Sequence, residues 1–191
     1  MAFVEPPPPH ALWALDEATE VLRNKNAEPK ARAEALAQIM HLVGDIHQPL
    51  HVADRGDRGG NDVPVAPLMA NGTRPKNLHA FWDAAYRYDS KDGQMIELRA
   101  TAEQALIHGV SPQDANLLPA SQHPWRAWAC ETHAIACESG WPKEWLNGNK
   151  AAPVQLTPAF VHAAHEIALE RIALAGESLA ALLNDLLSEG K

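Results

Sequence analysis

The sequence has little of what disulfide-rich, membrane-spanning and exported proteins depend on. Its two cysteines, Cys130 and Cys137, are too few for a disulfide framework. On a continuous helix they would lie about 10 Å apart, which is too far for a bridge. No apolar run reaches the length needed to cross a membrane. Residues 1–10 lack the basic and apolar regions of a secretory signal, so the chain as written is expected to stay in the cytoplasm.

Positive charge and β-branched residues are also scarce. The chain has 16 Lys and Arg against 24 Asp and Glu, which gives a net charge of −8. This balance argues against a broad basic groove that holds nucleic acid through many phosphate contacts. Val and Ile together occur 16 times and Ala 34 times, which favours helices over sheets. A hydrophobic content of 46% is typical of a globular protein.

The apolar periodicity predicts an all-α fold in a single helical domain that covers residues 1–191. Four consecutive prolines, Pro6 to Pro9, make residues 1–9 an extended arm. Residues 52–76 are rich in Gly, Asp, Asn and Pro, and we expect a long functional loop there, with a short hairpin at Asn71-Gly72. The predicted helices are residues 11–23, 30–47, 77–88, 94–108, 125–139 and 157–187.

What the sequence does contain is histidine, ten residues in all, and two of these stand in HxxxD pairs. His41 precedes Asp45, and His79 precedes Asp83, by the four residues that place two side chains on one helix face. Such a pair supplies two of the ligands that zinc prefers. The alternative is a solvated helix face on which each pair shares only a hydrogen bond. Because Pro49 breaks the first helix, a third histidine, His51, can turn back toward the first pair.

The remaining histidines have weaker signals. His47 falls near the apolar stripe of its helix and is interpreted as structural. His162 and His165 are three residues apart on the final helix, but no cluster of carboxylates accompanies them in the sequence. His10 is expected only to begin the first helix. These residues therefore do not enter the predicted metal site.

The segment from His41 to His51, His-Leu-Val-Gly-Asp-Ile-His-Gln-Pro-Leu-His, resembles the signature of the S1/P1 nucleases. This family consists of zinc-dependent single-strand nucleases and 3′-nucleotidases. Four further segments and their order agree with the resemblance, which covers nearly the whole chain. They are Gly59-Gly60-Asn61, Asn77-Leu-His-Ala-Phe-Trp-Asp83 and the helical stretches 128–133 and 173–184.

The resemblance implies an all-α fold of the phospholipase C and P1 nuclease type and a cluster of up to three zinc ions. By motif matching, His51, His79 and Asp83 correspond to the three protein ligands of one zinc. His41 and Asp45 correspond to half the ligand set of a second zinc, and Asp45 also to the bridge to a third. Zinc would then supply the positive charge that the surface lacks. The implied substrate is single-stranded DNA or RNA, cleaved to 5′-nucleotides. No catalytic or substrate-binding residue beyond these ligands can be named.

The sequence departs from the family pattern at its front. Four metal ligands of the family, a Trp, a His, an Asp and a second His, have no counterpart here, and the chain corresponds to the C-terminal two-thirds of a member, without its N-terminal helices. We therefore expect one complete zinc site and weak or absent nuclease activity. The family itself is secreted or periplasmic.

Three alternatives stay open at this point. One is hydrolysis of phospholipids, as by phospholipase C, on the same scaffold. Another is a catalytically weak or inactive zinc-binding helical remnant. The last is a helical interaction module with no metal. No membrane association is expected, and the sequence does not identify protein partners.

Overall fold

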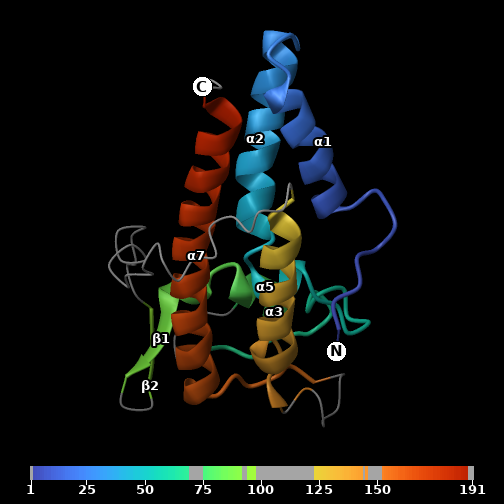
Figure 1. The fold of residues 1–191 in the computed structure, drawn as a ribbon. Helices are drawn as coiled ribbons and strands as arrows, with labels where there is room; N and C mark the ends of the chain where they lie inside the picture. The colour runs from blue at the N-terminus through green and yellow to red at the C-terminus, as the bar shows by residue number, and fades with distance from the viewer. Residues whose placement is uncertain are drawn as a thin grey trace.

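A computed structural model describes residues 2–68, 75–91, 94–97, 123–143, 145 and 152–188. Within these residues the fold is helical apart from one two-stranded hairpin (Figure 1). This confirms the predicted fold class. The helices are α1 (Ala11–Arg23), α2 (Pro29–Asp45), α3 (Leu78–Trp82), α5 (Trp125–Ser139) and α7 (Pro158–Leu187), with the 3-10 turns η1 (Pro49–His51) and η2 (Ala85–Arg87). The strands are β1 (Tyr88–Lys91) and β2 (Gln94–Glu97).

The long helix α7 organises the fold. It packs against α1 and α2 in one half and against η2 and the β hairpin in the other (Figure 1). Thr157 caps its N-terminus by accepting a hydrogen bond from the backbone N–H of Phe160 at 3.2 Å, and Pro158 occupies its first turn. In the part of the chain that the structure describes, no helix is long and apolar enough to cross a membrane.

The buried side chains form two clusters along α7. One joins α1 and α2 to the start of α5 and the end of α7, and it includes Leu15, Ile39 and Trp125. The other surrounds α3 and includes Leu50, Leu78 and Phe81. Because Leu50 and Leu78 each lie one residue from a predicted zinc ligand, this second cluster fixes the backbone from which those ligands project. Five tryptophans belong to these clusters, and all of them are buried: Trp82, Trp125, Trp128, Trp141 and Trp145.

The predicted bounds of α1 and α5 are confirmed, and those of α2 and α7 within two residues. The predicted helix at 77–88 is too long, because α3 ends at Trp82 and Tyr88 already begins β1. The helix predicted from Gln94 is wrong over residues 94–97, which pair with β1 in antiparallel register from Tyr88↔Glu97 to Lys91↔Gln94. The backbone hydrogen bonds to β1 determine the conformation there, although the apolar residues follow a helical spacing. Residues 98–108 and the expected hairpin at 71–72 lie outside the described residues.

Helix α5 carries both cysteines, which are unpaired as expected, and contacts the N-terminal arm. Cys130 and Cys137 are both free thiols on α5. The arm carries no helix or strand over residues 2–9. Its Glu5 forms paired hydrogen bonds with the Arg126 guanidinium, both at 3.0 Å, which tie the arm to α5.

Candidate metal centre

The turn at the end of α2 brings His51 back beside Asp45. The helix ends at Asp45, and Pro49 then opens the 3-10 turn η1, which carries His51. Gln48 caps this turn, because its side-chain oxygen accepts a hydrogen bond from the backbone N–H of Leu50. The His51 Nδ1 atom lies 3.6 Å from Asp45 Oδ1. The predicted reversal at Pro49 is therefore present.

The short helix α3 supplies the other two candidate ligands. Asn77 caps it by accepting a hydrogen bond from the backbone N–H of Ala80 at 2.8 Å. One helical turn then places His79 Nε2 3.9 Å from Asp83 Oδ1. The indole N–H of Trp82 donates to the Gly140 carbonyl at 2.9 Å, which anchors α3 to the end of α5.

A tight turn over residues 54–60 orients the ring of His79. The Asp54 carboxylate accepts backbone N–H groups from Gly56 and Gly59 at 3.0 and 3.1 Å. The Gly59 carbonyl accepts a hydrogen bond from His79 Nδ1 at 2.8 Å, so Nε2 is the ring nitrogen that faces Asp83. Gly59 has φ 61°, and a Cβ atom there would lie 2.6 Å from the Leu50 carbonyl oxygen. Only glycine fits this position without a shift of the backbone.

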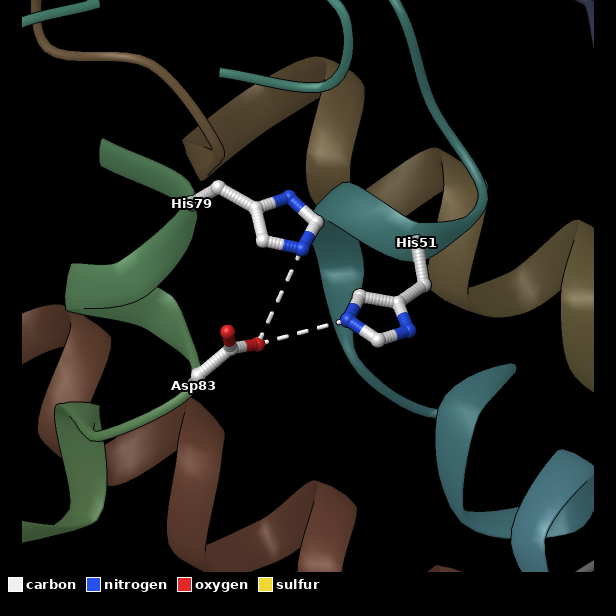
Figure 2. A group of neighbouring side chains, drawn as sticks. All are labelled: His51, His79 and Asp83. Carbon is white, nitrogen blue, oxygen red and sulfur yellow. Dashed lines mark hydrogen bonds and ion pairs between the residues drawn. The ribbon is translucent and has the colours of Figure 1, made fainter. Parts of the chain in front are cut away.

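Figure 2 shows His51, His79 and Asp83 converging from η1 and from α3. His51 Nε2 lies 3.3 Å from Asp83 Oδ1, and one ligand atom from each of the three residues lies within 4.8 Å of the others. A tetrahedral zinc ion with ligands at about 2.0–2.1 Å separates neighbouring ligand atoms by about 3.4 Å. The donor set is one that zinc prefers, and the 3.3 Å between His51 and Asp83 matches this separation, whereas the wider separations, up to 4.8 Å, would have to shorten around a bound ion. The two imidazole rings are stacked, with centroids 4.8 Å apart and planes inclined by 11°.

The electrostatics of the group match this arrangement. The hydrogen bond from His51 holds the pKa of Asp83 below its ordinary value, and a hydrogen bond from Gln48 and the charge of His79 lower it further. Burial alone lowers the pKa of His51, but its bonds and charge interactions with Asp83 and Asp45 outweigh burial and raise it. Asp83 is thus an anion over a wide pH range, as a metal ligand must be.

His41 and Asp45 lie at the edge of this group. His41 Nε2 is 3.2 Å from Asp45 Oδ2, and its side chain is 73% exposed. Asp45 therefore lies between His41 on one side and His51 on the other. Among the described residues, the three that could hold a metal ion together are His51, His79 and Asp83. The geometry thus places Asp45 between the two histidines and leaves His41 at the surface.

A cavity of about 730 Å³ opens beside the centre. Asp45, His51 and His79 contribute to its wall, which is otherwise largely apolar and includes Phe3 of the N-terminal arm. Arg58 also lines it, and its guanidinium lies 3.3 Å from Asp62 Oδ1. Its volume is that of a small-molecule site.

His47 is structural, as its position on the apolar stripe indicates. The ring is 2% exposed, and its Nδ1 donates to the Val43 carbonyl at 2.7 Å. Burial lowers its pKa to about 4, so it is neutral at pH 7. His162 gains a partner that the sequence did not indicate, because Asp89 of β1 lies 2.8 Å from its Nδ1. His165 is buried, and its ring lies against the Ala85 carbonyl.

Two residues at the centre were not predicted from the sequence. Gln48 donates a hydrogen bond from Nε2 to Asp83 Oδ1 at 2.8 Å, and Asp54 organises the turn that orients His79. The sequence could have indicated Gln48, since it lies between the candidate ligands Asp45 and His51. Asp54 stands five residues before Gly59, and nothing in that spacing links it to His79.

Comparisons with known proteins identify relatives of this chain. The family model described as S1/P1 Nuclease matches residues 6–188. Endonuclease 4 of Arabidopsis thaliana is 32% identical over 165 residues, which cover 81% of this chain and 51% of that protein. Endonuclease 2 of the same plant is 30% identical over 163 residues, or 79% and 51% of the two chains. Nuclease S1 of Aspergillus oryzae is 27% identical over 100 residues, or 52% and 33%. The chain spans about half the length of the plant relatives.

Proposed function

The chain belongs to the S1/P1 nuclease family, and from this premise we propose that it is a zinc-dependent nuclease that cleaves single-stranded DNA or RNA. His51, His79 and Asp83 would hold one zinc ion. Asp45, and His41 beside it, would contribute to a neighbouring site. Zinc in such a centre supplies Lewis-acid chemistry that activates water and stabilises negative charge on a phosphodiester.

One observation supports this proposal: three candidate ligands converge, and each is held in place by its neighbours. His79 is fixed by the Gly59 carbonyl, Asp83 by the Gln48 amide, and His51 by its place on the η1 turn. Metal-binding histidines usually donate their second ring N–H to such a carbonyl.

The surroundings suit a short stretch of nucleic acid. With a net charge of −8, the chain cannot offer a long basic groove. A bound metal would supply positive charge at one point beside the apolar cavity. We therefore propose a substrate that is engaged through one or two nucleotides rather than along a duplex.

A second candidate is zinc binding with weak or no hydrolysis. The geometry of His41 favours it, because this residue is largely exposed and pairs with Asp45. Two protein ligands seldom hold zinc without help. In this case the His51, His79 and Asp83 site would fill while the neighbouring half-site would not.

The two candidates separate in a cleavage assay on the zinc-loaded 191-residue chain. The substrates are a single-stranded oligonucleotide, its duplex and phosphatidylcholine vesicles. His79→Ala removes a ligand, and His162→Ala is the matched control at an exposed histidine of α7. The first candidate predicts weak cleavage of the single strand that His79→Ala abolishes and His162→Ala preserves. Zinc binding without cleavage would favour the second candidate, and cleavage that survives His79→Ala would contradict the proposed site.

A further inference from the structure

The Gln48 side chain makes two hydrogen bonds at the candidate metal centre, one as acceptor and one as donor. Its side-chain oxygen accepts the backbone N–H of Leu50, and its side-chain nitrogen donates to Asp83 Oδ1 at 2.8 Å. The first bond caps the η1 turn that carries His51. The second reaches a carboxylate 35 residues further along the chain. One side chain therefore connects the segment of one candidate ligand to the side chain of another.

The chemistry at this position requires an amide. An ionised glutamate could cap the turn but could not donate to the Asp83 carboxylate. A serine could cap the turn through its hydroxyl but is too short to span to Asp83. Three nitrogen atoms meet at Asp83 Oδ1, from Gln48 at 2.8 Å, His51 at 3.3 Å and His79 at 3.9 Å. Without Gln48, the histidines alone would orient the carboxylate.

We propose that Gln48 is a positioning residue of the metal centre, which holds Asp83 toward His51 and His79 and so sets the affinity for zinc. This inference rests on the proposed function, since it presumes that the three residues bind the ion. Hydrogen-bond partners of metal ligands typically change metal affinity by about tenfold to a hundredfold when they are removed.

The test uses Gln48→Ser in the full chain, because serine retains the cap on η1 and loses the bond to Asp83. Zinc affinity is measured by competition with a chelator, and the fold by thermal unfolding of the metal-free protein. We expect zinc affinity to fall by about tenfold to a hundredfold while the unfolding temperature stays close to that of the unaltered chain. Gln155→Ser makes the same change at an exposed position before α7 and should leave zinc affinity unchanged. Equal affinity in Gln48→Ser and the unaltered chain would overturn the proposal.

A second comparison shows whether Gln48 acts through Asp83. Gln48→Asn keeps an amide that can cap η1 but is one methylene shorter, so it should lose the bond to Asp83 and weaken zinc binding as Gln48→Ser does. Zinc affinity equal to that of the unaltered chain in Gln48→Asn would mean that Gln48 acts only through the turn, which contradicts the proposal. If the unaltered chain does not bind zinc, the proposed function fails, an outcome that is distinct from failure at Gln48.

Discussion

The close approach of Gly59 to the Leu50 segment gives the sharpest test of the local structure. Gly59 and Gly56 both have positive φ angles, 61° and 76°, so alanine at either position carries the left-handed penalty of about 1–2 kcal/mol. A Cβ at Gly56 would meet nothing within 4 Å, whereas one at Gly59 would lie 2.6 Å from the Leu50 oxygen and 3.3 Å from the Ala53 oxygen. Overpacking of this kind adds about 1–3 kcal/mol. We therefore expect Gly59→Ala to lower the free energy of unfolding by about 2–5 kcal/mol, and Gly56→Ala to lower it by only about 1–2 kcal/mol.

The assay is equilibrium unfolding in urea, with both variants compared with the unaltered metal-free chain. Both substitutions restrict the unfolded chain equally, so this contribution cancels in the comparison. Because Gly59 also presents the carbonyl that holds His79, Gly59→Ala should lower zinc affinity by about tenfold or more, and Gly56→Ala should not. Equal free energies of unfolding for the two variants would refute the reasoning, since the close contact would then carry no cost.

Two further predictions concern buried polar groups. The folded pKa of His47 is about 4 and its ordinary value 6.5, so its contribution to stability is complete above pH 6.5 and is lost as the pH falls toward 4. This contribution amounts to about 3 kcal/mol of the free energy of unfolding. His47→Gln should remove this part of the pH dependence of urea unfolding. An unchanged pH profile in His47→Gln would contradict the prediction. Trp141→Phe removes the indole donor that lies 2.6 Å from Asp57 Oδ2, and we expect a loss of about 1–3 kcal/mol in the same assay. No loss would show that Asp57 does not depend on this bond.

Local periodicity predicted most of the fold. Each of α1, α5 and α7 buries one regular apolar stripe, and a stripe is visible in the sequence whatever the helix packs against. The strand β2 was missed because its pairing with β1 decides its conformation. The dipeptide Asp92-Gly93 between Lys91 and Gln94 is a common hairpin signal and could have indicated it.

The candidate site was predictable where spacing sets geometry. His79 and Asp83 lie four residues apart, and the break at Pro49 explains the return of His51 to Asp45. The bond between His79 and Gly59 joins residues 20 positions apart through a turn, and no periodic pattern encodes it. The exposure of His41 likewise depends on which elements pack around the end of α2 and not on its spacing from Asp45.

The zinc content of the purified chain tests the central claim most directly. Elemental analysis after zinc loading and removal of free metal should find about one tightly held ion per chain, as three protein ligands predict. His79→Ala and Asp83→Ala should lose this ion, and the matched control His162→Ala should keep it. A chain that holds no zinc, or that holds it equally well in His79→Ala, would contradict the assignment of His51, His79 and Asp83 as the metal centre.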